Sequence, residues 1–201
     1  MIKRTFDVIL AGVGLIVSAP LWALFAAAIR FEDGAPVFFP QERVGLGGRV
    51  FTALKFRSMV ANADRLTGPV QAGADDPRVT RVGRLLRGTA MDELPQLWNI
   101  FVGDMSFVGP RPLVPGEVEV RGDGRMIKLA DIDGYEARHR VRPGLTGLTQ
   151  VYAARDIPRR SKFRLDGLYL QRAGLCLDVK LILLSFWITG RGAWESRDRK
   201  V

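Results

Sequence analysis

Cysteine and histidine are almost absent from this chain of 201 residues, which contains one of each, Cys176 and His139. A single cysteine cannot form an internal disulfide, so a disulfide-stapled fold is excluded and a reducing compartment is the simplest interpretation. We expect Cys176 to be a small core or interface residue. One histidine excludes a histidine-rich metal site, and the chain has no Gly-x-Ser-x-Gly elbow that would favour a Ser-His-Asp triad.

Glycine-rich phosphate loops are also missing: the chain contains neither Gly-x-Gly-x-x-Gly nor Gly-x-x-x-x-Gly-Lys-Ser/Thr, and it has no internal repeat. Acidic residues are in deficit, with 21 Asp and Glu against 30 Lys and Arg, for a net charge of +9. Such a balance indicates an anionic partner: nucleic acid, an anionic membrane surface or a phosphorylated substrate. The length allows one domain, alone or with a membrane element.

Charge is absent from Val8 to Ile29, an apolar run long enough to cross a hydrocarbon core of about 30 Å. Ser18 and Pro20 lie in its middle, and the proline, which lacks a backbone donor, predicts a kink there. Basic residues flank both ends of the run and favour the cytosolic side for both. We therefore predict a re-entrant helix that enters one leaflet and returns. A straight membrane span and a buried core helix are the alternatives.

Apolar and polar residues partly alternate over Val50–Met59, which predicts a strand. Lys55 and Arg57 are two residues apart and would share one of its faces. That face is either solvated or directed at a phosphate, and the spacing alone supports both interpretations. Thr67–Pro77 is rich in Gly and Pro and is expected to be a loop.

Helical spacing is found over Val82–Leu86 and again over Asp92–Phe101, where Leu94, Leu97, Trp98 and Phe101 form one stripe that we expect in the core. Asp92 and Glu93 would begin this second helix, where backbone N–H groups and the helix dipole favour anions. Acidic residues in a first helical turn are commonly mere caps.

The neighbours of the acidic pair favour a chemical role over a capping role. Arg87 precedes Asp92 and Glu93, while Gly103-Asp104 and Arg111 follow them. A carboxylate can attack phosphorus or hold a divalent cation, and guanidinium groups bind phosphate oxygens bidentately.

The C-terminal half is mixed. Glu117–Glu136 is expected to be helical in parts, and the basic stretch Arg138–Arg164 contains a single acid. Phe163–Thr189 is apolar at helical spacing, but charged residues within it disfavour a membrane span. It fits an amphipathic helix on the membrane surface with Trp187 and Trp194 as interfacial anchors, and a core-packed helix is the alternative.

Several of these segments form an ordered set of motifs. The apolar helix broken near Pro20 is followed by Lys55–Met59, Asp92–Leu97, Gly103–Pro112 and Arg142–Gly147. Together they resemble the small monotopic phosphoglycosyl transferases, the bacterial sugar transferase family, over nearly the whole chain. The resemblance implies an α+β fold that is mostly helical with a small β element, a kinked re-entrant membrane helix over residues 1–31 and a cytosolic catalytic domain with membrane-surface amphipathic helices over residues 32–201.

The resemblance also implies a reaction. Such enzymes transfer a sugar-1-phosphate from a UDP-sugar to undecaprenyl phosphate and release UMP, through a covalent phosphosugar–aspartate intermediate and with Mg²⁺. This is the first membrane step of bacterial glycan assembly. The expected location is the bacterial inner membrane with the active site facing the cytoplasm. Nucleic acid is not among the expected partners, and a homodimer is compatible with the sequence.

The resemblance assigns roles to individual residues. Asp92 would be the nucleophile, and Glu93 would help to place the metal or take a proton from the acceptor. Both acids are candidate Mg²⁺ ligands. Phosphate binding would fall to basic side chains: Lys55, Arg57, Arg87, Arg111 and Arg155.

The sequence departs from the family pattern in two places. Ala19 separates Ser18 from the helix-breaking Pro20, and Leu148–Arg155 replaces the Trp-Ala-Gln-Val-Asn-Gly-Arg that members often carry. Two other functions compete with the transferase. One is a membrane-attached basic binding protein without catalysis, and the other is a metal-dependent hydrolase that uses the same acids.

Overall fold

The structure is a computed structural model that describes the chain except for residues 1, 62, 64–75, 121–123, 155–156 and 193–201. Most of the expected loop over residues 67–77 lies outside the described residues, as do Arg155 and Trp194. The predicted fold class is confirmed. The described residues are mostly helical, with three small two-stranded sheets.

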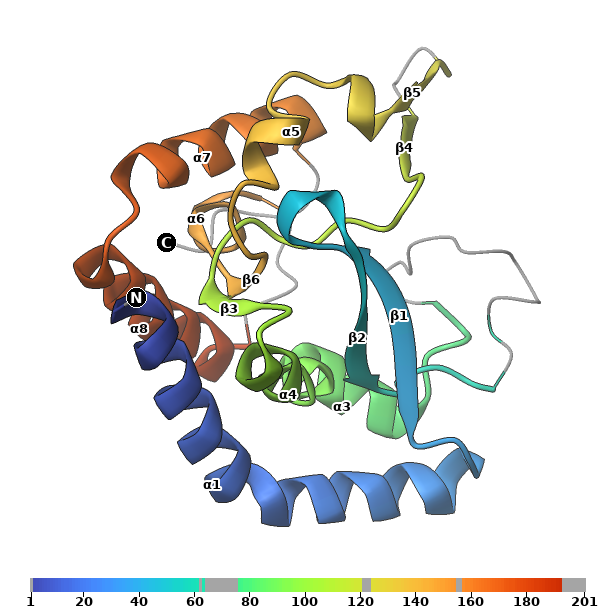
Figure 1. Cartoon of the computed structure of the whole chain (residues 1–201). Helices are drawn as coiled ribbons and strands as arrows, with labels where there is room; N and C mark the ends of the chain where they lie inside the picture. Colours follow the sequence, from blue (N-terminus) through green and yellow to red (C-terminus); the bar gives the residue numbers. More distant parts are fainter. Residues whose placement is uncertain (1, 62, 64–75, 121–123, 155–156, 193–201) are drawn as a thin grey trace.

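Helix α1 (Ile2–Asp33) is continuous through Pro20 and changes direction near its middle, as Figure 1 shows. Ser18 is buried at this bend, but its hydroxyl makes no hydrogen bond to the described residues. The bend therefore follows from Pro20, whose ring clashes with the preceding turn and which leaves a carbonyl without its donor.

Both halves of α1 pack against the rest of the chain. In the first half, Ala11 is fully buried beside Leu97 and Ile100 of α4 (Gln96–Val102). In the second half, Ile29 is buried with Phe56 and Leu86. The N-terminal and C-terminal halves of the helix are thus parts of two different hydrophobic clusters of one body.

Polar contacts reinforce this attachment of α1 at its start. Lys3 Nζ donates to Asp178 Oδ2 at 2.6 Å, and the buried Asp7 carboxylate accepts the backbone N–H of Phe107 at 3.2 Å. Arg4 donates to the carbonyls of Ile100 and Phe101, at 2.6 and 2.8 Å. These carbonyls lie at the C-terminal end of α4, where helix carbonyls lack intrahelical donors and attract cations.

The predicted strand near residue 50 is confirmed as β2 (Val50–Phe56), which pairs antiparallel with β1 (Phe38–Val44). A turn with the 3₁₀-helix η1 (Leu46–Gly48) joins the two strands. Figure 1 shows this long hairpin rising from the end of α1, so it connects α1 to the centre of the molecule.

The helix predicted over Asp92–Phe101 is wrong at its start. After α3 (Arg81–Gly88), Ala90 takes a left-handed φ of 55° and the chain forms the 3₁₀-turn η2 (Met91–Glu93). Only after Pro95 does α4 begin. Proline has no N–H to donate and fits the beginning of a helix, so it separates the acidic turn from the helix proper.

The stripe expected in the core is also only half buried. Leu97 is buried, but Trp98 and Phe101 are 47% and 39% exposed and stack on each other with ring centroids 6.0 Å apart. Phe101 approaches Gly12 of α1. Helical periodicity identifies an apolar face but does not distinguish the protein interior from another apolar medium.

Two short strands bring the middle and the later part of the chain together. Strand β3 (Ser106–Val108) pairs parallel with β6 (Gly144–Thr146). Their ends need glycine, because a Cβ on Gly109 would lie 2.4 Å from the Arg142 carbonyl and a Cβ on Gly144 would lie 2.0 Å from the Gly109 nitrogen. This contact holds two motifs, Gly109–Pro112 and Arg142–Gly147, against each other.

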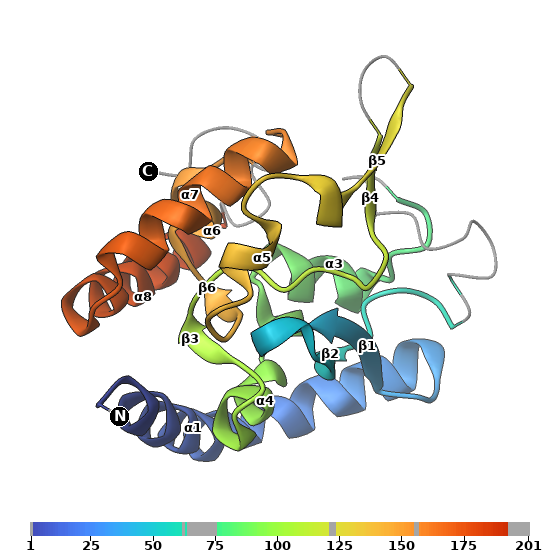
Figure 2. The same ribbon diagram turned by 45° about the horizontal axis from the view of Figure 1, so that its top comes forward.

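The helix expected within Glu117–Glu136 is mainly a hairpin of β4 (Val118–Val120) and β5 (Met126–Lys128), followed by η3 (Leu129–Asp131) and the single helical turn α5 (Tyr135–Arg138). The alternation Val118-Glu119-Val120 favours a strand, and Gly124 has a positive φ that suits a turn. Figures 1 and 2 both show the hairpin projecting away from α1.

The apolar C-terminal segment forms two helices. After α6 (Leu148–Tyr152), the helices α7 (Arg159–Arg172) and α8 (Leu175–Gly190) are separated at Ala173 and Gly174. They diverge from this point in Figure 1, and both pack against α6. Helix α8 has features of both a core-packed helix and an amphipathic surface helix. Leu181 and Ile188 are core residues, whereas Phe186 and Trp187 are exposed. Cys176 is exposed on α8, so of the two expected positions the core is wrong and an interface stays a prediction.

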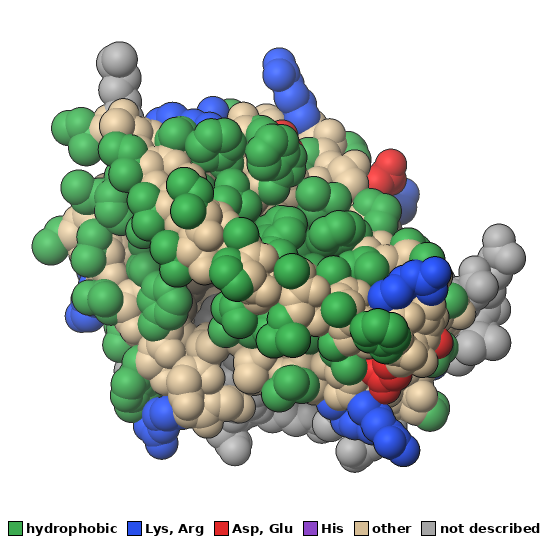
Figure 3. Space-filling view, turned by 90° about the horizontal axis from the view of Figure 1, so that it is seen from below, with side chains coloured by type: hydrophobic (Ala, Val, Ile, Leu, Met, Phe, Trp, Pro, Cys, Tyr) green, Lys and Arg blue, Asp and Glu red, His purple; other side chains and the backbone are tan. Residues whose placement is uncertain are grey.

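One face of the molecule is strongly apolar. Figure 3 shows hydrophobic side chains covering the surface seen from below Figure 1, where α1 runs. Only 11% of the most apolar 18-residue window of α1 is buried within the protein, and among the described helices α1 alone is long and apolar enough to cross a membrane. Trp98, Phe186 and Trp187 add exposed aromatic rings from α4 and α8.

Candidate active site

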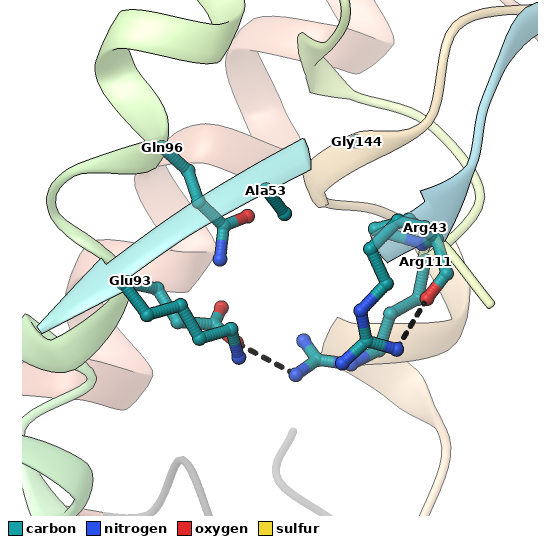
Figure 4. A pocket seen from close by; sticks show the side chains of 8 residues that line it. Arg43, Ala53, Glu93, Gln96, Arg111 and Gly144 are labelled. Atoms are coloured by element: carbon teal, nitrogen blue, oxygen red, sulfur yellow. Dashed lines mark hydrogen bonds and ion pairs between the residues drawn. The ribbon is translucent and has the colours of Figure 1, made fainter. Parts of the chain in front are cut away.

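Glu93 is the centre of a charged cluster. Its side chain is 7% exposed, and its Oε1 atom accepts hydrogen bonds from Lys55 Nζ and from Arg111, each at 2.7 Å. Figure 4 shows the side chains of Glu93 and Arg111 pointing toward each other. Three parts of the chain meet here: strand β2, the turn η2 and the turn that follows β3.

Each of these parts is fixed from behind by the fold. The Asn99 side chain on α4 accepts the N–H of Leu54 at 3.0 Å and donates to the Thr52 carbonyl at 2.7 Å, so the helix after the acidic pair is held to the strand that carries Lys55. The buried Arg138 donates to the Arg111 carbonyl at 2.6 Å and pairs with Asp166 at 2.9 Å. The site is therefore built from contacts between distant segments.

The two adjacent carboxylates differ in their surroundings. Burial alone would raise the pKa of Glu93, but the charges and hydrogen bonds of Arg111 and Lys55 outweigh it and hold this pKa well below its usual range. For Asp92, burial dominates and raises the pKa to about 6. The charge of Lys55 opposes this rise and that of Glu93 adds to it, while Arg87 and Arg111 lower the pKa of Asp92.

Asp92 is not held by a partner. Within the part of the chain that the structure describes, its carboxylate makes no hydrogen bond and no ion pair. Lys55 and Arg111 donate to Glu93 instead. With a pKa of about 6, Asp92 is a carboxylate that is mostly ionised at neutral pH and available to another group.

The structure separates the two basic residues expected on one strand face. Lys55 reaches Glu93, whereas Arg57 is buried past the end of β2 and donates to the carbonyls of Asp33 and Gly34, both at 2.9 Å. Arg57 thus holds the end of α1. Among the other predicted phosphate-binding residues, Arg111 lies in the cluster and the charge of Arg87 acts on Asp92, while Arg155 lies outside the described residues.

A small pocket opens beside Glu93 (Figure 4). It includes two residues that the sequence analysis missed as site residues, Arg43 and Gln96. The full lining is Arg43, Ala53, Lys55, Glu93, Gln96, Arg111, Pro112 and Gly144. Arg43 is isolated in the sequence. The register of the β1–β2 hairpin, which pairs Arg43 with Phe51, puts it on the same face as Lys55, and the fold adds Arg111 to the same pocket. Gln96 lies three residues after Glu93, a spacing that places two side chains on one side of a helix. This spacing was the one indication in the sequence that Gln96 belongs to the site.

The residues fit a magnesium ion that is shared with a substrate. Among the described residues no group of three or more His, Cys, Asp or Glu side chains could form an all-protein metal cage. Mg²⁺, however, is commonly bound through one or two carboxylates together with substrate phosphates. Asp92 and Glu93 supply such a pair, with Asp92 not engaged elsewhere among the described residues.

The chain is similar to known proteins over most of its length. The family model described as bacterial sugar transferase matches residues 1–192. The UDP-glucose:undecaprenyl-phosphate glucose-1-phosphate transferase of Caulobacter vibrioides is 43% identical over 188 residues, which cover 90% of this chain and 67% of that protein. The exopolysaccharide production protein ExoY of Sinorhizobium fredii is 38% identical over 194 residues, with 90% and 81% covered.

Longer relatives also match. The undecaprenyl-phosphate glucose phosphotransferase of Komagataeibacter xylinus is 40% identical over 190 residues, which cover 91% of this chain but only 35% of that protein. The chain therefore spans about a third of the length of this relative and most of the length of ExoY.

Proposed function

Because this chain belongs to the bacterial sugar transferase family, we propose that it transfers a sugar-1-phosphate from a UDP-sugar to undecaprenyl phosphate and releases UMP. Its relatives include an undecaprenyl-phosphate glucose phosphotransferase and an undecaprenyl-phosphate galactose phosphotransferase. One observation carries the proposal on the chain itself. Asp92 is a carboxylate without a hydrogen-bonding partner among the described residues, directly beside a carboxylate held by two cations.

In the first step, a carboxylate oxygen of Asp92 attacks the β-phosphorus of the UDP-sugar. The bond between this phosphorus and the oxygen that bridges to the α-phosphorus breaks, and UMP leaves with the bonding electrons. Lys55, Arg87 and Arg111 lie where their charges can bind phosphate oxygens, as guanidinium and ammonium groups do. The product is a sugar phosphate joined to Asp92 as an acyl phosphate.

In the second step, an oxygen of undecaprenyl phosphate attacks the same phosphorus. The bond to Asp92 breaks, the carboxylate is regenerated and the lipid-linked sugar diphosphate departs. Glu93 stays ionised because Lys55 and Arg111 stabilise its charge, so it acts at neutral pH as an anion that positions these cations. Mg²⁺, held by Asp92 or Glu93 together with the diphosphate, would supply neutralisation of the charge on the phosphates.

The way α1 is attached supports a re-entrant helix rather than a membrane span. Its first half packs on α4 and forms ion pairs and hydrogen bonds through Lys3, Arg4 and Asp7, and its second half packs on Phe56 and Leu86. A straight span would place the two ends on opposite sides of the bilayer, about 30 Å apart. Both ends here contact one body, so we propose that α1 enters and leaves the cytoplasmic leaflet of the inner membrane.

This placement suits the acceptor. A polyprenol phosphate keeps its tail in the lipid and its phosphate at the surface. The exposed apolar side chains of α1 and the aromatic rings on α4 and α8 would face the lipid, which is typical of interfacial anchoring. The turn η2, which carries Asp92 and Glu93, is separated from α4 only by Leu94 and Pro95, so the acids are close in the chain to the helix that packs against α1.

The test of the reaction is UMP release from UDP-sugars with Mg²⁺ and undecaprenyl phosphate in detergent. We expect wild type to release UMP and Asp92→Asn to release less than about a thousandth as much, as for loss of a nucleophile. Asp133→Asn makes the same change at a side chain that is 86% exposed and should leave activity unchanged. A radiolabelled sugar phosphate should remain on wild-type protein when the lipid is omitted. Retention of activity by a folded Asp92→Asn variant would refute the mechanism.

The test of topology uses single cysteines at both ends of α1. In a Cys176→Ser background, Ile2→Cys and Phe31→Cys replace residues that are 74% and 90% exposed. A membrane-impermeant maleimide should label neither position in intact spheroplasts and both in inverted vesicles. Labelling of one end in each preparation would indicate a straight span instead.

A further inference from the structure

Arg43 is a charged side chain without an acidic partner. Its guanidinium donates to the Pro112 carbonyl at 3.2 Å and to the amide oxygen of Gln41, both of which are neutral acceptors. Among the described residues, no carboxylate forms an ion pair with it. A largely buried guanidinium usually pairs with an anion, because desolvation of an unpaired charge is costly.

The strand register places Arg43 beside the cluster on Glu93. In the β1–β2 hairpin, Gln41 lies opposite Ala53 and Phe39 lies opposite Lys55. Alternate residues share a face, so Arg43 and Lys55 project from the same face with the small, buried Ala53 between them. Ala53 leaves space there, and the pocket lies over it.

Arg111 lies on the other side of this space, and Figure 4 shows Arg43 next to it. Burial lowers the pKa of Arg43 to about 10; the like charges of Arg111 and Arg159 act in the same direction, and the charges of Glu93 and Glu117 oppose them. Arg43 is still protonated at neutral pH. The pocket is therefore lined by three cations and a single carboxylate, that of Glu93, which already accepts from Lys55 and Arg111.

We propose that Arg43 is a substrate-binding residue that contacts phosphate oxygens in this pocket. It lies on the same face of the hairpin as Lys55, on the other side of Ala53. An anion would balance the surplus positive charge, and a phosphate can accept two parallel hydrogen bonds from one guanidinium. The proposal rests on the proposed function, in which two substrates carry phosphate: the diphosphate of the UDP-sugar and the headgroup of undecaprenyl phosphate. Both present the same chemistry, and kinetics separate them.

The experiment compares the full-length protein in detergent as wild type, Arg43→Gln, Arg43→Lys and Arg49→Gln. Arg49 lies in the same hairpin but is exposed, so Arg49→Gln controls for loss of one positive charge. KM for the UDP-sugar and for undecaprenyl phosphate is measured separately, together with inhibition constants of uridine, UMP and UDP. Loss of hydrogen bonds to a charged group predicts a rise of about 10- to 100-fold in one KM for Arg43→Gln. Arg43→Lys should give a smaller rise because it keeps the charge but not the fork.

The pattern of the changes distinguishes contact from mere support of the Pro112 turn. A contact with the donor raises KM for the UDP-sugar and weakens UDP or UMP while leaving uridine unchanged. A contact with the acceptor raises KM for undecaprenyl phosphate only. Equal weakening of uridine, UMP and UDP, or constants within twofold of wild type, would overturn the proposal. If Arg43→Gln does not fold, Arg43→Lys decides by the same constants. Failure of the proposed function is recognised separately, because wild type would then release no UMP.

Discussion

Replacing Lys55 with methionine should move the pH dependence of the first chemical step. The Lys55 ammonium donates to Glu93 at 2.7 Å, and its charge is the largest influence that lowers the pKa of Asp92. The variant removes this charge while keeping the length of the side chain. Arg111 still holds Glu93 ionised, so Asp92 would sit beside a negative charge with less compensation.

The size of the shift follows from the pKa of about 6 for Asp92 in the intact site. A neighbouring opposite charge typically changes a carboxyl pKa by about 1–3 units, so loss of Lys55 should raise it to about 7 or above. The attacking form is the carboxylate, which is present above the pKa and lost as the pH falls through it. At pH 6 the ionised fraction would drop from about one half to about one tenth.

The assay is the burst of UMP in a single turnover, without lipid and at saturating UDP-sugar, from pH 5 to pH 9. Because no lipid is present, protonation of the acceptor phosphate cannot contribute to the pH dependence. Because the UDP-sugar is saturating, weaker binding of the donor by the variant cannot contribute either. Lys128→Met on the exposed face of β5 is the matched control and should keep the wild-type midpoint. A midpoint for Lys55→Met that stays the same or moves to lower pH would refute the role of ionised Asp92 beside Lys55.

Two further predictions concern stability, measured as thermal unfolding in detergent. Gly144→Ala should destabilise the fold by about 3 kcal/mol or more, because its Cβ would lie 2.0 Å from the Gly109 nitrogen, whereas Gly167→Ala meets nothing within 4 Å and should be neutral or stabilising by up to about 1 kcal/mol. An equal effect of the two would contradict the close strand contact. Lys3→Met should cost about 1–3 kcal/mol, because it removes a 2.6 Å ion pair from the buried Asp178 carboxylate, and Lys3→Arg should recover most of this loss.

The sequence was most informative where chemistry is local. The adjacent Asp92 and Glu93, with Arg111 after them, were identified from residue type and spacing, and the structure brings Glu93 and Arg111 within 2.7 Å. The predicted helix start was wrong. Pro95 is a local signal for the helix to begin after it, whereas the left-handed φ of Ala90 is unusual for a residue other than glycine and has no such signal in the sequence. The difference between Asp92 and Glu93 was not predictable, since it depends on which carboxylate the cations reach.

Other features could not be predicted because they depend on pairing or on the surrounding medium. Arg43 is an ordinary strand residue until the register with β2 puts it on the same face as Lys55 and in the same pocket. Arg57 is two residues from Lys55, a spacing that would put both side chains on one strand face toward a phosphate. Its guanidinium instead donates to the carbonyls at the end of α1. Trp98 fits a core stripe by period, yet its side chain is half exposed. Periodicity reports that a side chain is apolar and not what surrounds it.

The double attachment of α1 has a practical consequence for protein engineering. Membrane anchors are commonly removed to obtain a soluble catalytic fragment. Here the anchor supplies part of the core: a fragment that begins after Asp33 would uncover Leu97 and Ile100 on one side and Phe56 and Leu86 on the other. It would also leave the carbonyls at the end of α4 without Arg4. Solubility is better sought by substituting the exposed apolar side chains of α1 than by deleting the helix.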